Sequence, residues 1–141
     1  MGRFSDEKVK ERCYFALVRP HLEYAASIWD PVQKDLNSEL NKIQRKAARF
    51  VKNCYGRTDS VTQMLNELGW EPLVTRRLRA RLRLLEQLRI DIFKSETENI
   101  ILEPHYISRS DRSDKLREIF CRTDRYGNSF FPRTIKDFNK C

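Results

Sequence analysis

The sequence lacks the residue patterns on which most catalytic and metal sites depend. It has no adjacent Asp-Asp pair, no Gly-rich phosphate loop, no GxSxG element and no His-Glu zinc motif. Its four cysteines stand far apart with no CxxC pair, and neither histidine lies at ligand spacing from them, which argues against a zinc site. We therefore expect no catalytic residue, no cofactor and no metal, and no small-molecule substrate.

Long apolar runs are also missing. No stretch approaches the ~20 apolar residues that a membrane-spanning helix needs, and the N-terminal sequence MGRFSDEKVK has no apolar signal-peptide region. Hydrophobic residues still make up 40% of the 141 residues, which is enough to form a core. We expect a folded protein of the cytoplasm or nucleus with no membrane partner.

Acidic residues are outnumbered by basic ones. The chain carries 28 Lys and Arg against 20 Asp and Glu, a formal net charge of +8. A positive surface attracts anionic partners, and nucleic acid is the commonest of these for a small basic domain. Charge alone is also compatible with a solubilising surface that binds nothing.

Residues 36–54 have the pattern of an amphipathic helix. Apolar residues recur at helical spacing on one side: Leu36, Leu40, Ile43, Ala47, Phe50, Val51 and Cys54. Basic residues occupy the other side: Lys42, Arg45, Lys46, Arg49 and Lys52. This pattern predicts one buried face and one strongly basic face.

A second long helix is predicted over residues 73–94, with Pro72 in its first turn. Its expected buried face consists of Val74, Leu78, Leu82, Leu85, Ile92 and Phe93. Arg76, Arg79 and Arg83 line up on another face, with Arg77 and Arg81 flanking the apolar stripe. No acidic residue interrupts this run, so we expect a second basic stripe that points away from the core.

The remaining segments complete a mainly α fold of four to five helices. The N-terminal segment predicts a first helix up to about Val18 and a second, kinked helix that Pro20 starts and that ends near Trp29. Residues 96–115 are polar and turn-rich, which is typical of a connector. A small C-terminal β-hairpin could form over residues 117–131, followed by a short helix over 133–139.

Three strings in this order resemble the C-terminal end of a LINE-type, non-LTR retrotransposon reverse transcriptase: LVRPHLEYAASIWDP (17–31), QRKAARFV (44–51) and NSFFPRTI (128–135). The resemblance covers nearly the whole chain and implies the helical thumb and the segment that follows it. It implies a thumb-like helical domain over residues 1–95, a connector over 96–115, and a C-terminal hairpin and short helix (116–141) packed on the same domain.

The resemblance also implies a function. The catalytic palm, with its paired aspartates, is absent from this sequence, so we expect a non-catalytic fragment that is not an enzyme by itself. A thumb lays its helices along RNA or RNA–DNA duplex, and arginine forks match phosphate oxygens without reading sequence. The candidate nucleic-acid-binding residues are Lys42, Arg45, Lys46, Arg49 and Lys52 in the first helix and Arg76, Arg79 and Arg83 in the second.

Two other functions stay open. The Leu17–Trp29 segment could bind a protein, such as a reverse-transcriptase palm, or a second copy of this chain. The short helix after Ser60, Gly69 and the Arg-rich helix could form a helix-turn-helix DNA reader, although no Asn or Gln early in the long helix offers base contacts. The aromatic residues Tyr14, Phe15, Tyr24 and Trp29 are expected to pack in the core rather than to stack on bases.

Overall fold

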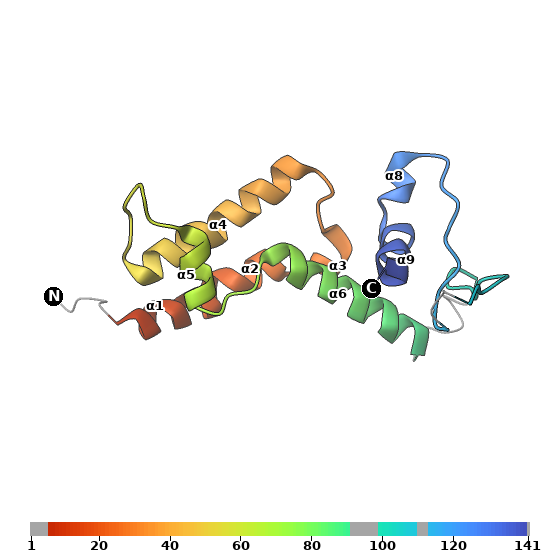
Figure 1. The fold of residues 1–141 in the computed structure, drawn as a ribbon, viewed down its shortest axis with the longest axis horizontal. Helices are drawn as coiled ribbons and strands as arrows, with labels where there is room; N and C mark the ends of the chain where they lie inside the picture. The colour runs from red at the N-terminus through yellow and green to blue at the C-terminus, as the bar shows by residue number, and fades with distance from the viewer. Residues whose placement is uncertain (1–5, 91–98, 110–112, 141) are drawn as a thin grey trace. The chain divides into compact units, whose positions relative to one another are not determined.

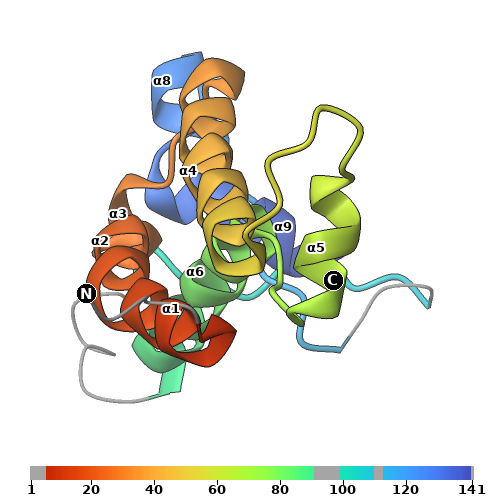
Figure 2. The same cartoon turned by 90° about the vertical axis from the view of Figure 1, so that its left-hand side faces the viewer.

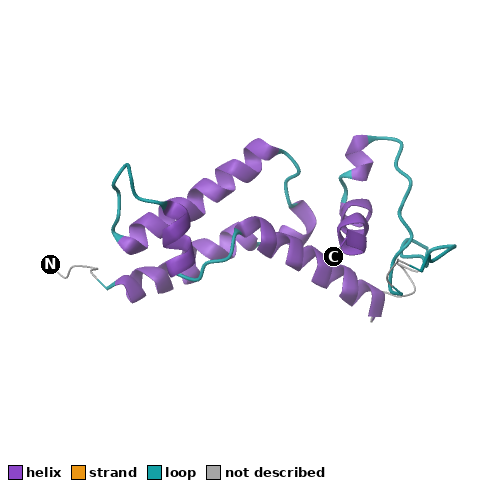
Figure 3. Ribbon diagram, in the orientation of Figure 1, coloured by secondary structure: helices purple, strands orange, loops and turns teal. Residues whose placement is uncertain are grey.

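The computed structural model describes residues 6–90, 99–109 and 113–140. Within these residues the chain is mainly helical and contains no β-strand (Figure 3). The mainly α fold class predicted from the sequence is therefore confirmed. The described part holds no helix that is long and apolar enough to cross a membrane. The chain divides into two compact units, Met1–Arg77 and Leu78–Cys141.

The first unit begins with four short helical segments: α1 (Glu7–Cys13), the π-helix η1 (Tyr14–Val18), α2 (Arg19–Glu23) and α3 (Ala26–Trp29). Pro20 lies in the first turn of α2, as expected for a proline that starts a helix, and the π-helix η1 joins α2 to α1 without a gap. The break comes at Ala25, whose φ of 50° lies in the left-handed region. This conformation is costly for a residue with a Cβ, and it turns α3 away from α2.

Three further elements close this unit: α4 (Lys34–Lys52), α5 (Val61–Glu67) and the first turn of α6 (Leu73–Ile90). Helix α4 packs on α1 and on α5 (Figures 1 and 2). Ser60 caps α5, since its Oγ accepts a hydrogen bond from the Gln63 N–H. The core between these elements consists of Tyr14, Leu22, Ala48, Val51, Met64, Trp70 and Leu73.

The buried face of α4 matches the predicted one only in part: Val51 is buried and Leu40 and Ala47 pack against the core as predicted. Gln44, Ala48 and Val51 are buried, whereas Leu36, Ile43 and Phe50 are exposed, as is Cys54. The buried Gln44 is satisfied there, since its Nε2 donates a hydrogen bond of 3.0 Å to the backbone oxygen of Glu71. A satisfied amide can be buried at little cost, so Gln44 takes a place that the apolar pattern assigned to its neighbours.

Helix α6 also turns an unexpected face inward. Leu73, Arg77, Arg81 and Leu85 are buried, whereas Val74 is exposed; the predicted core residues Ile92 and Phe93 lie outside the described residues. The boundary between the two units falls within α6, after Arg77, rather than at residue 95 as the sequence suggested. The reason is that the second half of α6 has a core of its own.

That second core consists of Leu85, Leu116, Ile135 and Phe138. It joins α6 to α9 (Phe130–Lys140), which follows the short helix α8 (Asp124–Gly127). The predicted hairpin over 117–131 was wrong. Thr123 caps α8 by accepting the Tyr126 N–H, and the backbone of Leu116 pairs with the side chain of Asn139 instead of with a strand. The described residues of the predicted connector are non-helical.

Candidate nucleic-acid interface

The basic face of α4 carries a run of basic residues that no acidic residue interrupts. No acidic residue occurs between Glu39 and Asp59 in the sequence. Lys42, Arg45 and Lys46 are exposed and Arg49 is half-buried. Because these four cations recur at intervals of three and four residues, the helix places them along one side.

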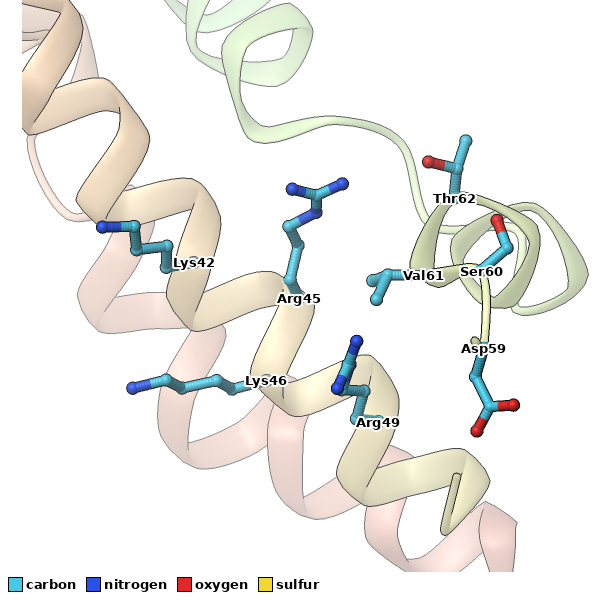
Figure 4. A pocket seen from close by; sticks show the side chains of 8 residues that line it. All are labelled: Lys42, Arg45, Lys46, Arg49, Asp59, Ser60, Val61 and Thr62. Carbon is cyan, nitrogen blue, oxygen red and sulfur yellow. The ribbon is translucent and has the colours of Figure 1, made fainter. Parts of the chain in front are cut away.

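A groove of about 470 Å³ lies between this face and the start of α5. Arg45 and Arg49 project into it, whereas Lys42 and Lys46 extend away from α5 (Figure 4). Ser60, Val61 and Thr62 form the opposite wall. The groove therefore combines guanidinium groups on one side with hydroxyl groups on the other, and both kinds of group can donate hydrogen bonds to phosphate oxygens.

A second groove, of about 370 Å³, continues along α4 toward its N-terminus. The two grooves share Lys42 and Arg45, and the second is also lined by Lys34, Asn37, Ser38, Asn41 and Val74. The sequence prediction missed Lys34, Ser38 and Asn41. They precede Arg45 by eleven, seven and four residues, which places them on the same side of the helix. This spacing and the charge of Lys34 were signals that could have found them.

The cations of α4 differ in whether they form ion pairs with other residues of the protein. Arg45, Lys46 and Arg49 form no ion pair with any other residue that the structure describes. Lys42 bonds to Glu39 at 2.6 Å, and this hydrogen bond holds the pKa of the Glu39 carboxyl below its ordinary value. That pair is solvent-exposed, so a competing phosphate can replace it.

Lys52 has a structural role instead. Its Nζ lies 2.8 Å from a carboxylate oxygen of Glu7 on α1 and 3.4 Å from one of Glu67 on α5. The hydrogen bond to Glu7, with that to Glu67, raises the pKa of the Lys52 ammonium. Lys52 therefore ties three helices together and is not on the open part of the basic face.

The predicted stripe of Arg76, Arg79 and Arg83 is not a single exposed face. The Arg76 side chain is only 10% exposed and is paired with Glu23, a carboxylate that also accepts from Arg19 at 3.2 Å. Burial lowers the pKa of Arg76. The expectation that Arg76 points away from the core was therefore wrong. Arg79 and Arg83 are exposed and belong to the second unit.

The aromatic residues divide into two groups. Tyr14 and Phe15 pack with Trp70 in the core, as expected. Tyr24 is 79% exposed and Trp29 is 43% exposed, so their predicted burial was wrong. With three aliphatic neighbours they form what we call the apolar patch, which consists of Leu17, Val18, Tyr24, Ile28 and Trp29, all exposed.

Among the residues that the structure describes, no group of three or more His, Cys, Asp or Glu side chains is arranged to hold a metal ion. The Asp59 carboxylate also lines the basic groove, opposite four cations of α4, and accepts a hydrogen bond of 2.7 Å from the Gly56 N–H. It forms no ion pair with the α4 cations within the described ranges. The groove thus keeps its positive charge.

Comparisons with known proteins supply no further guide to this surface. The chain matches no protein-family model, no curated protein and no solved structure. A function must therefore be argued from the residues and their geometry, and the resemblance to a reverse-transcriptase thumb rests on the three sequence strings alone.

Proposed function

We propose that this chain is the non-catalytic thumb and post-thumb region of a LINE-type retrotransposon reverse transcriptase, and that it binds the backbone of RNA or RNA–DNA duplex without sequence preference. The observation that carries the proposal is the basic face of α4, on which Arg45, Lys46 and Arg49 form no ion pair with another residue of the described ranges. The protein acts in the cytoplasm or nucleus and needs no cofactor.

The chemistry of the α4 face supports phosphate rather than base recognition. Lysine and arginine only donate hydrogen bonds, and they carry the charge that phosphate needs. Arginine can bind two phosphate oxygens at once. Arg79 and Arg83 on α6 are additional exposed cations. A helix-turn-helix function is not favoured, because Arg76 and Arg77 near the start of α6 are turned inward and could not reach base edges.

A second candidate function is binding of a protein, either a reverse-transcriptase palm or a second copy of this chain. The apolar patch supports it, since Tyr24 and Ile28 are 79% and 74% exposed, and large apolar side chains that are left exposed close together in the sequence are candidates for an interaction site. The two functions differ in their salt dependence. Apolar association is insensitive to moderate salt, whereas phosphate binding weakens steeply with it.

The salt dependence of duplex binding tests the proposal. We expect the affinity for a labelled RNA–DNA duplex, measured by fluorescence anisotropy between about 50 and 300 mM salt, to fall with a log–log slope of about −3 to −4 if four α4 cations contact phosphates. A variant with Arg45→Ala, Lys46→Ala and Arg49→Ala should flatten the slope by about 2 to 3, because each substitution removes one phosphate contact.

A control variant that also loses three positive charges distinguishes the effect of specific phosphate contacts from the effect of overall charge. Lys8→Ala, Arg125→Ala and Lys136→Ala also remove three exposed cations, all of them outside the two grooves, and should leave the slope nearly unchanged. If both variants bind as the natural sequence does, the α4 face is merely solvated, and the protein-binding function takes its place.

A further inference from the structure

The polar side of α4 changes its chemical character along the helix. Toward its C-terminal end stand Arg45, Lys46 and Arg49, which can only donate hydrogen bonds. Toward its N-terminal end the second groove is lined by the neutral residues Asn37, Ser38 and Asn41, which stand between the cations Lys34 and Lys42. These side chains both donate and accept. A ligand that lies along both grooves therefore meets neutral hydrogen-bonding groups between cations in the second groove.

Only two of the three neutral residues are available to a ligand. The Asn37 amide is fully engaged: its Nδ2 donates 2.6 Å to the Pro31 oxygen and its Oδ1 accepts 3.0 Å from Arg77. Ser38 is exposed and Asn41 is half-buried. Neither side chain bonds to any other residue in the described part of the chain. Asn37 thus fixes the wall of the groove, and Ser38 and Asn41 face its open space unpaired.

The 2′-hydroxyl of ribose is the group that matches this pair. It donates and accepts hydrogen bonds, and it is what distinguishes RNA from DNA along the backbone. Asn41 precedes Arg45 by one helical turn, about 6 Å along the axis. Two nucleotides of a duplex strand span a similar distance, at about 3.4 Å each. One strand can therefore place a phosphate at Arg45 and a ribose at Asn41.

We propose that Ser38 and Asn41 bind ribose 2′-hydroxyls of a strand whose phosphates lie on Arg45 and Arg49, so that the α4 face selects RNA over DNA. This inference rests on the proposed backbone binding and adds the class of nucleic acid. The A-form minor groove is wide and shallow and displays its 2′-hydroxyls, which makes them accessible to the side of a helix.

Matched duplexes of one sequence test the selection. Affinities are measured by anisotropy at one salt concentration for RNA–RNA, RNA–DNA, DNA–DNA and 2′-O-methyl RNA duplexes. We expect the chain to bind RNA–RNA and RNA–DNA about five- to tenfold more tightly than DNA–DNA, the effect of one to two hydrogen bonds. The 2′-O-methyl duplex keeps the A-form shape but has no hydroxyl proton, and it should bind about as weakly as DNA.

The variant Ser38→Ala with Asn41→Ala should lower RNA affinity to the level of DNA and leave DNA affinity unchanged within about twofold. Asn66→Ala, which removes an exposed amide on α5 outside both grooves, should change neither. Equal affinity for RNA and DNA with a steep salt slope would overturn ribose selection alone. If the double variant still prefers RNA, the preference comes from duplex shape and not from the two side chains, and the proposal is overturned as well. No binding to any duplex would overturn backbone binding as well.

Discussion

Arg77 is the clearest case of a charged residue that serves the fold and not a ligand. It is 1% exposed, and its Nη1 donates to the Asn37 Oδ1 at 3.0 Å and lies 3.9 Å from the Asp30 carboxylate. Burial lowers the pKa of Arg77, and the nearby Asp30 opposes this. A buried guanidinium needs such partners, because an unpaired charge in the interior is very costly. Arg77 therefore links α6 to α4 and to the end of α3.

The buried Tyr14 hydroxyl predicts a pH dependence of the protein's stability. Its ring stacks on Trp70 with a centroid separation of 4.2 Å. Burial raises the pKa of the Tyr14 hydroxyl above its ordinary value of 10.0, although the nearby Arg76 and Arg19 offset part of the rise. A raised pKa in the folded state means stability that is complete below pH 10 and is lost as the pH rises through the folded value. We expect urea stability, followed by circular dichroism, to fall above about pH 10.

Tyr14→Phe should weaken this pH dependence, because phenylalanine has no proton to lose. Lys52 also lowers stability at high pH, since the hydrogen bond to Glu7 raises its pKa above 10.5. The part of the pH dependence that Lys52 causes should remain in the Tyr14→Phe variant. An unchanged pH dependence in Tyr14→Phe would show that the buried hydroxyl is not its source.

Among the elements, the helical segments α1, η1 and α2 continue through Pro20 without a break. Proline has no N–H, and its ring clashes with the carbonyl four residues earlier. In η1 the Arg19 N–H reaches back five residues to the Tyr14 oxygen, which is the wider π pattern. The wider turn makes room for the ring, so α1, η1 and α2 follow one another without a gap.

Gly69 ends α5 in a way that decides where Trp70 lies. The Gly69 N–H donates to Asn66 and the Trp70 N–H donates to Leu65, the pair of bonds of a Schellman motif. Gly69 has a φ of 64°, and a Cβ there would meet nothing within 4 Å. Gly69→Ala should therefore lower the free energy of unfolding by about 1–2 kcal/mol through backbone strain alone, measured by urea denaturation.

Gly127→Ala is the matched control for this substitution. Gly127 is the last residue of α8 and does not have a positive φ. A Cβ there would lie 3.5 Å from the Cys121 Cβ, an ordinary contact. We expect a change within about 0.5 kcal/mol. Equal losses at both positions would mean that steric contact or lost flexibility, and not the left-handed conformation, determines the cost.

The elements also show what the sequence could and could not predict. Periodicity located α4 and α6 well, because hydrophobic spacing reports the existence of an amphipathic helix. It misjudged which side is buried, because Gln44, Arg77 and Arg81 are buried through hydrogen bonds to distant residues, which spacing cannot detect. The candidate nucleic-acid-binding residues were predicted only in part for the same reason: Lys52 on α4 and Arg76 on α6 have acidic partners far away in the sequence.

At the scale of the whole molecule, two separate cores hold the described helices. The first joins residues between Tyr14 and Leu73, and the second joins residues between Leu85 and Phe138. The two clusters share no residue. The second also has its own buried polar pair, in which the Arg81 Nη2 donates 2.9 Å to Asp137. Each unit thus has the apolar and polar contacts that a cooperative folding unit needs.

The last prediction follows from this division. Ile135 is fully buried in the second core, so Ile135→Ala should destabilise the second unit by about 2–5 kcal/mol. Both tryptophans, Trp29 and Trp70, lie in the first unit. Tryptophan fluorescence therefore follows the first unit, and circular dichroism follows the helices of both. In urea, we expect the variant to lose part of its helical signal early while its fluorescence midpoint stays unchanged.

The reverse variant, Val51→Ala in the first core, serves as the control, since it should move the fluorescence midpoint and leave the second unit's share of the helical signal in place. If Ile135→Ala shifts both signals together, the two cores unfold as one. The same measurement bears on function. Because the α4 face lies wholly in the first unit, duplex binding should persist at urea concentrations where Ile135→Ala has already unfolded the second.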